Sequence, residues 1–285
     1  MEQEIIQKNW KGNKMQKRIA MIGGGNMAAA LVAGLVAAGH PADSISVMDR
    51  NEDKCTRLHS EYGVLTHMTA GEWLKKADLV VLAVKPQGMK VAIDQIRPYL
   101  SDGALFISIA AGLRIKDIAR WLGSDKVVRA MPNTPALVKA GVVGLYVPEG
   151  LEREKPLFVD VLKAMGEVID VKSELELDLL STVSGSGPAY VFRFIEALEE
   201  AAVKRGFESA SARKMAILTV VGAAKLAVQS SDSPAQLRIN VTSKGGTTAE
   251  ALRVMQEHHF MEMMDEAIEA AFDRSQVLAD ELGKN

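Results

Sequence analysis

Short apolar segments alternate with longer helical ones from Arg18 onward, and this alternation constrains the fold more than any other feature of the sequence. Nearly continuous apolar runs of this length are typical of strands that are buried on both faces of a parallel sheet. The intervening segments, such as the one through Leu31 to Ala38, have the composition of crossover helices. The chain therefore begins with a predicted α/β domain, whose strands are expected at residues 19–22, 45–48, 79–84, 104–108 and 127–130.

The strand pattern continues to about Lys172 and then disappears. Two further strands are expected at 142–147 and 168–171, on either side of a helix from about Leu151 to Met165. Beyond them the apolar residues follow a period of 3.6, which is typical of helices. This pattern is interrupted at 185–188, 206, 230–234 and 243–246, where breaks between helices are expected. This helical part could bury a modest core alone, or complete one against a second copy. We predict three segments: an extension at 1–16, an α/β domain at 17–172 and an all-α domain at 173–285.

Composition excludes several classes of function. The chain has 285 residues, of which 48% are hydrophobic and 25% charged, as in an ordinary globular protein. A net charge of -2 offers no basic surface for nucleic acid, and no apolar run approaches the roughly 20 residues that span a bilayer. The single cysteine, Cys55, and the lack of a signal-peptide pattern favour the cytoplasm. No metal is expected, because His40, His59 and His67 are scattered and His258 and His259 would point to different faces of one helix.

A glycine-rich segment follows the first strand. Residues 23–28 read Gly-Gly-Gly-Asn-Met-Ala, which matches the G-x-G-x-x-A pattern between a strand and a helix. Gly23 would permit the tight turn, and Gly25 would let the backbone approach a pyrophosphate at the helix N-terminus. Ala28 would keep the helix close to the sheet. The pattern predicts a Rossmann-type dinucleotide site, and the alternative is a glycine-rich turn that binds nothing.

Two polar positions bear on which dinucleotide would bind. Asp49 ends the second strand, where an acidic side chain typically meets the ribose hydroxyls of NAD, while Arg50 could neutralise the 2′-phosphate of NADP. These two residues point to different cofactors. Lys85 follows another strand within Ala83-Val84-Lys85-Pro86 and could reach a phosphate or the ribose, although lysines are also common on surfaces after strands.

Six separated motifs, in order, resemble those of the pyrroline-5-carboxylate reductase family over almost all of Lys17 to Leu282. One departure is Lys244, which stands where many members have proline. The motifs are Gly-Gly-Gly-Asn-Met, Ala-Val-Lys-Pro, Ser108-Ile-Ala-Ala-Gly112, Arg129-Ala-Met-Pro-Asn-Thr-Pro135, Ser184-Gly-Ser-Gly-Pro-Ala-Tyr190 and Val241-Thr-Ser-Lys-Gly-Gly-Thr-Thr-Ala-Glu250.

The resemblance implies an NAD(P)H-dependent reduction of the cyclic imine 1-pyrroline-5-carboxylate to L-proline, in proline biosynthesis. It implies NADP(H) as cofactor, with NAD(H) as the alternative, and a helical domain that forms an intertwined homodimer, with rings of dimers as a larger assembly. The substrate loop would comprise Ser243, Gly245, Gly246, Thr247 and Thr248. The cofactor residues would be Gly23, Gly25, Asn26, Met27, Asp49, Arg50, Ala83, Val84, Lys85, Pro86, Ala110, Ala111, Gly112 and Asn240.

The substrate loop has a second interpretation from its residues alone. The two glycines and the following helix N-terminus would form a receptacle for a carboxylate. However, Thr247-Thr248-Ala249-Glu250 also spells a capping box, in which Thr247 and Glu250 bond to the helix itself. Thr248 is the candidate catalytic residue, because a hydroxyl that donates to the imine nitrogen would stabilise the electron density left by hydride transfer.

Other interpretations stay open at this stage. A hydroxyacid dehydrogenase of similar plan usually carries a catalytic lysine after its second glycine motif, and Pro188 to Arg193 contains none. A dinucleotide-sensing protein without activity would be expected to have lost the substrate loop.

Gly185 to Pro188 fits an ordinary helix start with a packing role. Asn133 and Thr134 are expected in a rigid loop that could line the cleft. The acidic residues Glu174, Glu176 and Asp178 are most simply explained as a solvated helix face, although their family position is near the substrate cleft.

Overall fold

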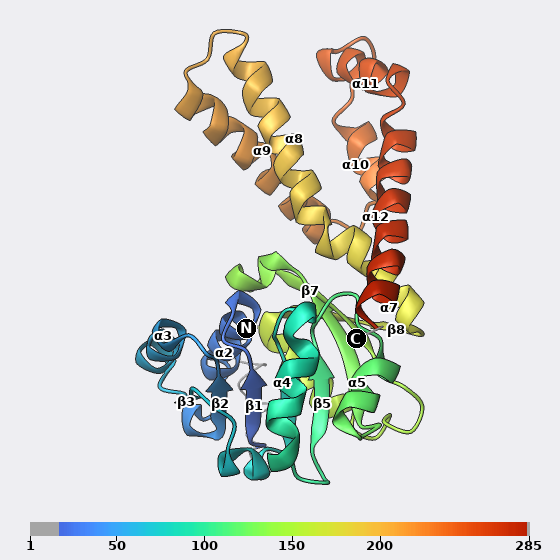
Figure 1. Cartoon of the computed structure of the whole chain (residues 1–285). Coiled ribbons are helices and arrows are strands. Elements are labelled where there is room, and N and C mark those ends of the chain that lie inside the picture. The colour runs from blue at the N-terminus through green and yellow to red at the C-terminus, as the bar shows by residue number, and fades with distance from the viewer. Residues whose placement is uncertain (1–16, 284–285) are drawn as a thin grey trace. The chain divides into compact units, whose positions relative to one another are not determined.

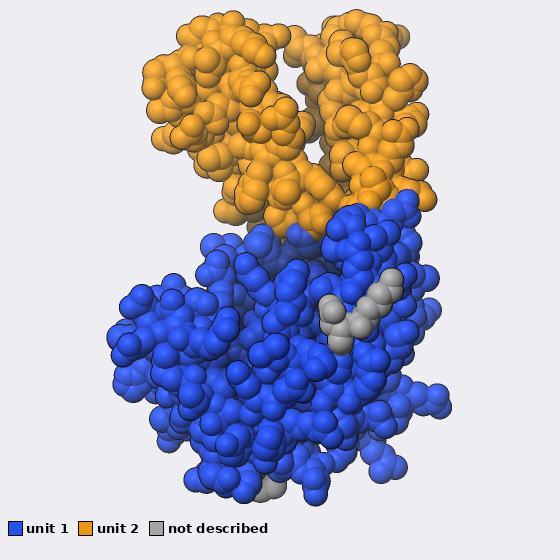
Figure 2. Space-filling view, in the orientation of Figure 1, with its two compact units in different colours: residues 1–185, 272–285 blue, residues 186–271 orange. Residues whose placement is uncertain are grey.

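The computed structural model describes residues 17–283, so the predicted extension at 1–16 lies outside the described residues (Figure 1). The described chain divides into two compact units, which Figure 2 colours separately. Unit 1 comprises residues 17–185 and 272–283, and unit 2 comprises Ser186–Ala271. The predicted boundary at residue 172 marks the end of the last strand. The compact units instead change at Gly185, because the first helical turns after the sheet pack with unit 1.

Unit 1 is built on one eight-stranded sheet of order β3-β2-β1-β4-β5-β6-β7-β8. The first six strands run parallel, as a Rossmann-type domain requires. The predicted fold class is therefore confirmed. The strands are β1 Ile19–Ile22, β2 Ile45–Met48, β3 Leu65–His67, β4 Leu79–Leu82, β5 Leu105–Ser108, β6 Val127–Pro132, β7 Gly141–Tyr146 and β8 Gly166–Val171.

Two features of the sheet differ from the prediction. The sequence pattern assigned no residues to β3. This strand has three residues and begins with an exposed Leu65, so it carries no apolar run. The expectation of a wholly parallel sheet is wrong at β7, which pairs antiparallel with β6. Only residues 133–140 join these two strands, and a parallel connection needs a crossover of a dozen or more residues. Strand β8 then pairs parallel with β7 through the helix between them.

Helices cover both faces of the sheet. Along β1, Ile19 and Met21 belong to the core on one face, and Ala20 and Ile22 to the core on the other. One face is covered by α2 Asn26–Ala37, α3 Glu52–Tyr62 and α6 Lys155–Leu162, and the other by α4 Met89–Ile96 and α5 Ile115–Leu122. Short 3₁₀ turns complete unit 1 at Ala42–Ser44, Glu72–Lys76, Pro86–Gly88, Arg97–Tyr99, Thr134–Val138 and Lys163–Met165.

The rest of the chain is helical, as predicted. All four predicted interruptions, near residues 185, 206, 230 and 243, fall between helices, and one more occurs at His258 and His259. The expectation that these histidines share one helix is therefore wrong, and His259 has a φ of 54° at the break. No helix among residues 17–283 is long and apolar enough to cross a membrane. The elements are α7 Glu174–Leu180, a π-helical turn Ser181–Gly185, α8 Gly187–Val203, α9 Ser209–Gln229, α10 Pro234–Asn240, α11 Thr247–Glu257 and α12 Phe260–Leu282.

Unit 2 has almost no core of its own. Between residues 186 and 271, all of which the structure describes, the buried side chains are those of Ala212 and Ala216. Large apolar side chains on the same helices are exposed, among them Phe192 at 65% and Leu218 at 57%. A chain segment of this length normally buries most of its apolar surface, so these helices present faces that need covering.

Candidate active site

The carboxyl ends of the parallel strands gather the predicted cofactor residues at one edge of the sheet. Ile22 of β1 is in register with Met48 of β2 and with Leu82 of β4, and Leu82 is in register with Ser108 of β5. The loops that follow these four strands therefore leave the sheet at the same level. In open α/β sheets this edge is where ligands bind.

The glycine-rich turn has the geometry that a dinucleotide phosphate requires. Gly23 has a φ of 106°, and a Cβ on it would lie 2.8 Å from the carbonyl oxygen of Ala83, so a side chain is excluded. Gly25 is the N-cap of α2, where no side chain caps the helix and no acidic residue occupies the first turn. A Cβ on Gly25 would meet no atom within 4 Å. The N-terminus of α2 thus opens onto free space with its amides available, which fits a pyrophosphate.

Asp49 is bonded to the glycine-rich turn. Its Oδ2 accepts from the Gly24 amide at 2.8 Å and from Lys54 Nζ at 3.2 Å, and its Oδ1 accepts from the Asn51 amide at 2.9 Å. Burial raises the pKa of this carboxyl, but the hydrogen bonds from Asn51 and Gly24 and the charge of Lys54 outweigh burial, so the pKa of Asp49 lies below its ordinary value. Arg50 is exposed. The Asp49–Lys54 ion pair was missed by sequence reasoning, although Lys54 lies in the first turn of the helix that follows Asp49.

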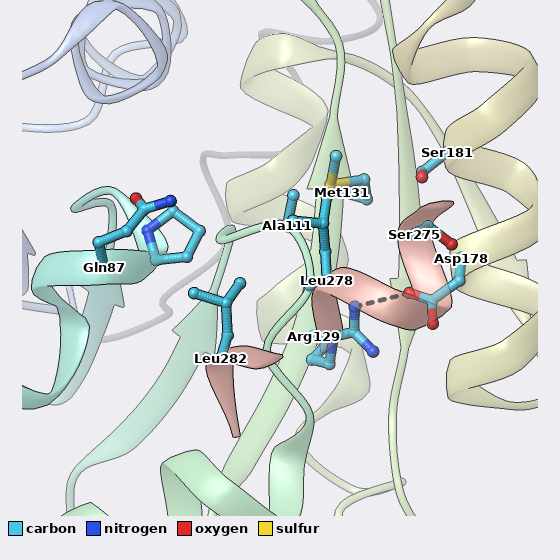
Figure 3. Close-up of a pocket in the computed structure, with 11 residues that line it drawn as sticks. Gln87, Ala111, Arg129, Met131, Asp178, Ser181, Ser275, Leu278 and Leu282 are labelled. Carbon is cyan, nitrogen blue, oxygen red and sulfur yellow. Dashed lines mark hydrogen bonds and ion pairs between the residues drawn. The ribbon is translucent and has the colours of Figure 1, made fainter. Parts of the chain in front are cut away.

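A cavity of about 140 Å³ lies beside the remaining predicted cofactor loops (Figure 3). The loop Ala110–Gly112 follows β5, and Gly112 takes a φ of 70°. Lys85, after β4, is exposed. The structure therefore brings Pro86, Ala111 and Gly112 to one cavity. The residues that line it are Pro86, Gln87, Ala111, Gly112, Arg129, Met131, Asp178, Ser181, Ser275, Leu278 and Leu282.

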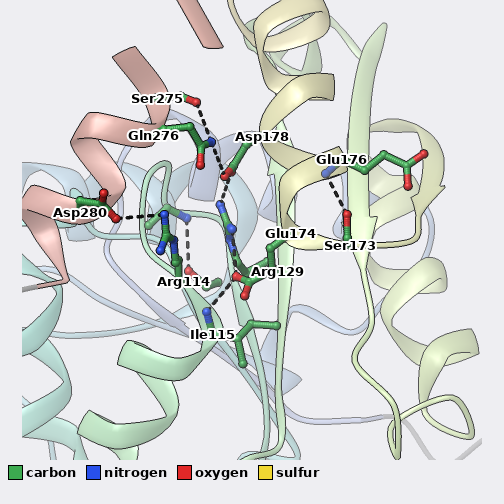
Figure 4. Close-up of polar contacts among 12 residues, drawn as sticks. Arg114, Ile115, Arg129, Ser173, Glu174, Glu176, Asp178, Ser275, Gln276 and Asp280 are labelled. Carbon is green, nitrogen blue, oxygen red and sulfur yellow. Dashed lines mark hydrogen bonds and ion pairs between the residues drawn. The ribbon is translucent and has the colours of Figure 1, made fainter. Parts of the chain in front are cut away.

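Beside this cavity lies a buried cluster of charges that the sequence did not predict (Figure 4). The Arg129 side chain, 4% exposed, donates from Nη1 to Glu174 Oε1 at 2.9 Å and from Nη2 to Asp178 Oδ1 at 2.8 Å. The interpretation of the acidic run as a solvated face is therefore wrong for Glu174 and Asp178, while Glu176 is exposed as expected. The available signal was Arg129 itself, a charge inside a buried strand, which needs an acidic partner.

Asn133 has a structural role between three elements. Its Oδ1 accepts from the Val142 amide, and its Nδ2 donates to the Ser184 carbonyl, each at 2.9 Å. It is buried, so it fastens the end of β6 to β7 and to the π-helical turn, while its neighbour Met131 lines the cavity. Thr134 is exposed. Pro188 stands in the first turn of α8, as predicted for an ordinary helix start.

The predicted substrate loop lies in unit 2, before α11. Gly245 has a φ of 68°, and a Cβ on Gly246 would run into Ser243 Oγ. The capping-box interpretation is wrong, because Gly246 is the N-cap of α11 and no side chain caps the helix. Glu250 instead accepts from Arg253 Nε at 3.0 Å. The helix thus begins at Thr247, with Thr247 and Thr248 exposed and the first amides uncapped.

Asn240 also belongs to unit 2, apart from the other predicted cofactor residues in the sequence. It ends α10, where its Oδ1 accepts from Gln236 Nε2 at 2.8 Å and its Nδ2 donates to Asp232 Oδ2 at 3.2 Å. These bonds fix the side chain at the start of the segment that leads to Ser243.

The cysteine and the histidines form no catalytic constellation. Cys55 is buried, and its Sγ lies 3.4 Å from the Asp49 carbonyl oxygen. Burial raises the pKa of the Cys55 thiol, which keeps it protonated. His67 stacks on Trp73 with ring centroids 4.1 Å apart, and burial lowers the pKa of His67. Within residues 17–283, no three His, Cys, Asp or Glu side chains gather as a metal site would require.

Comparison with known proteins bears directly on this site. A pyrroline-5-carboxylate reductase of Pseudomonas aeruginosa is 39% identical over 269 residues, which cover 94% of this chain and 98% of the relative. The chain belongs to the pyrroline-5-carboxylate reductase family. A relative of that name in Escherichia coli strain K12 is also 39% identical, with 93% of this chain and 99% of the relative covered. Membership in this reductase family makes the chain an oxidoreductase.

Family models match the two parts of the chain separately. The model described as pyrroline-5-carboxylate reductase dimerisation matches residues 174–278, which run from α7 through most of α12. The model described as NADP oxidoreductase, coenzyme F420-dependent, matches residues 18–112, which contain the glycine-rich turn and the loop after β5. A reductase of this family therefore carries a nicotinamide dinucleotide site in its sheet domain and an oligomerisation region in its helices.

Solved structures of pyrroline-5-carboxylate reductases agree with this assignment. The enzyme of Coxiella burnetii has a TM-score of 0.88 and is 40% identical, with 93% of this chain and 99% of that chain covered. The enzyme of Plasmodium falciparum, solved with NADP bound, has a TM-score of 0.81 and is 28% identical, with 93% and 100% covered.

Proposed function

We propose that this chain reduces 1-pyrroline-5-carboxylate to L-proline with a reduced nicotinamide dinucleotide. The observation that carries the proposal is the open, uncapped N-terminus of α2 behind Gly25, in a chain 39% identical to a named reductase over almost its whole length. The amides of Gly25 and of the first turn of α2 would hold the pyrophosphate. The cofactor supplies the hydride when it is bound, and the protein positions it and the imine.

We propose NADP(H) as the main cofactor and NAD(H) as the alternative. Asp49 is already bonded to three donors of the protein, among them the Lys54 ammonium, so its charge is largely compensated. Arg50 is exposed beside it and free to meet a 2′-phosphate. The NADP-bound relative and the family model of residues 18–112 support this choice.

The substrate loop would hold the imine by its carboxylate and its nitrogen. Uncapped amides at the N-terminus of α11, with the Ser243 and Thr247 hydroxyls, would bind the carboxylate. Hydride transfer to the C=N carbon leaves an electron pair on nitrogen, and we assign the Thr248 hydroxyl to donate to that nitrogen. An imine can carry the required proton on its own nitrogen. It therefore needs no catalytic lysine of the kind that exchanges a proton with an alcohol substrate. The absence of a lysine between Pro188 and Arg193 therefore favours this reaction over hydroxyacid oxidation.

The activity is tested by following nicotinamide absorbance with 1-pyrroline-5-carboxylate and either NADPH or NADH. We expect oxidation of both cofactors, faster with NADPH, and a fall in kcat of roughly 10- to 100-fold in Thr248→Ala, since one hydrogen bond to developing charge is lost. Thr248→Ser should retain most of the rate. Thr242→Ala is the control, because the Thr242 hydroxyl is already bonded to the Arg238 carbonyl oxygen at 2.6 Å. Binding of both cofactors without any turnover would instead favour a sensing protein.

We also propose that the helical region joins two copies of the chain, at least as a homodimer. The exposed apolar faces of unit 2 and the dimerisation model over residues 174–278 support this proposal. Sedimentation equilibrium should give a mass of at least twice 30.8 kDa at micromolar concentration. Phe192→Asp should shift the mass toward the monomer, because it places a charge on an apolar face, whereas Lys204→Asp should not. A parent chain that sediments as a monomer would refute the dimer.

A further inference from the structure

We propose that Glu174 and Arg129 are positioning residues for the cofactor loop, defined here as Ala110–Gly112. This inference rests on the proposed function, because it concerns the part of the cofactor site that follows β5. Neither residue needs to touch the cofactor. Their role would be to fix the backbone on which the loop depends.

Glu174 joins the exit of the cofactor loop to the sheet. Its Oε1 accepts two hydrogen bonds at 2.9 Å, one from Arg129 Nη1 and one from the backbone amide of Ile115. Ile115 is the first residue of α5, and the N-cap residue Arg114 provides no side-chain cap. One orphan amide of this helix is thus satisfied by a carboxylate 59 positions away in the sequence.

The cofactor loop has little else to hold it from within. The Ala110 amide has one weak bond, to Ser108 Oγ at 3.4 Å, and Gly112 takes a φ of 70°. The segment is therefore held from its flanks. The Ile109 amide donates to the Leu82 carbonyl oxygen at 3.2 Å and Leu113 is fully buried, while Arg114 pairs with Asp280 at 3.0 Å and the Ile115 amide bonds to Glu174. On its outer side, a Cβ on Gly112 would come within 3.2 Å of Leu282 Cδ1, so α12 packs directly over the glycine.

The charge cluster also faces the loop. Arg129 and Asp178 line the same cavity as Ala111 and Gly112. Arg129 keeps Asp178 as a partner when Glu174 is removed, since Nη2 bonds to Asp178 Oδ1 at 2.8 Å. Loss of Glu174 therefore releases the Ile115 amide without leaving the buried guanidinium unpaired. The expected consequence is a displaced cofactor loop in a folded protein.

The test compares three variants of the whole chain by NADPH binding, measured from nucleotide fluorescence, and by steady-state kinetics. Glu174→Ala should raise the NADPH Kd and KM about tenfold, because small misplacements of binding groups are costly, with a smaller change in the KM for the imine. Glu174→Gln keeps an oxygen acceptor and should restore binding to within about twofold. Glu176→Ala is the matched control: it removes an acidic side chain of the same helix, bonded to the Lys172 amide and not to the loop, and should leave Kd unchanged.

The outcomes separate this inference from the proposed function. A parent chain that does not bind NADPH or reduce the imine overturns the proposed function. A parent that does both, with an unchanged Kd in folded Glu174→Ala or an equal change in Glu176→Ala, overturns the positioning role alone. If Glu174→Ala does not fold, Glu174→Asp decides the question, because its shorter side chain keeps the charge but cannot reach both donors; an unchanged Kd there overturns the proposal as well.

Discussion

Gly25→Asp is expected to abolish dinucleotide binding at working concentrations while leaving the fold slightly more stable. The new carboxylate would stand at the N-terminus of α2, where the pyrophosphate is proposed to bind. Repulsion between like charges at such a distance is worth roughly 4 kcal/mol, so the affinity should fall about 1000-fold. The fold should gain about 0.5 kcal/mol, because aspartate is a good N-cap and complements the helix dipole.

The structure permits this substitution without strain. Gly25 has a φ of -72°, which any residue adopts, and open space surrounds its absent side chain. Dinucleotide titration and thermal unfolding of the same sample measure the two effects. Gly103→Asp is the control, because it adds the same charge at a second glycine with open space around it. Unchanged NADPH affinity in Gly25→Asp would show that the phosphates bind elsewhere.

Arg129→Met is expected to cause the largest loss of stability of any substitution proposed for unit 1. The arginine holds Glu174 and Asp178 at 2.9 and 2.8 Å from a guanidinium that is almost fully buried. Removing it leaves two carboxylates close together with no cation, and loss of one partner from a buried ion pair typically costs about 3–5 kcal/mol. Thermal unfolding should therefore begin roughly 10 °C lower.

The matched comparison is a variant in which the carboxylates are neutralised as well. Arg129→Met combined with Glu174→Gln and Asp178→Asn removes the uncompensated charge and should recover most of the lost stability. Arg129→Lys should fall between the parent and Arg129→Met, because an ammonium keeps the charge but not the two-armed geometry. Equal melting temperatures for the single and triple variants would mean that packing, and not charge, accounts for the effect.

Much of unit 1 follows from local pattern. β1, β2 and the core of β4 were predicted because apolar runs such as Leu79–Leu82 are long enough to be recognised, and the helix after Gly25 because glycine and alanine spacing marks its start. The strand at 142–147 was predicted, but its antiparallel direction was not, because an apolar run carries no sign of direction. The short connection after β6 decides that direction.

The candidate site likewise contains features that a local sequence signal predicts and features that form only when distant residues meet in the fold. The turn at Gly23 and the loop at Gly112 were found because glycine signals a special backbone, and both have positive φ in the structure. The charge cluster was missed because Arg129 and Asp178 are 49 positions apart and meet only through the fold. The cap of α11 was misassigned for a related reason: a capping box and a Gly N-cap differ by one residue in register, and the sequence fits both.

In the sequence, unit 2 lies between the two parts of unit 1. The chain enters unit 2 at Ser186 and leaves it after Ala271. A ribosome that makes this protein therefore completes the sheet and the glycine-rich turn well before it reaches the residues that finish unit 1. Gln276, which donates to Asp178 Oδ2 at 3.2 Å, and Leu282, which covers Gly112, emerge only after the whole helical insertion. The nascent chain can thus build early the turn that is proposed to bind phosphate, but the loop Ala110–Gly112 is covered by α12 last. Maturation of the proposed cofactor site is in this way tied to synthesis of the region that the dimerisation model matches.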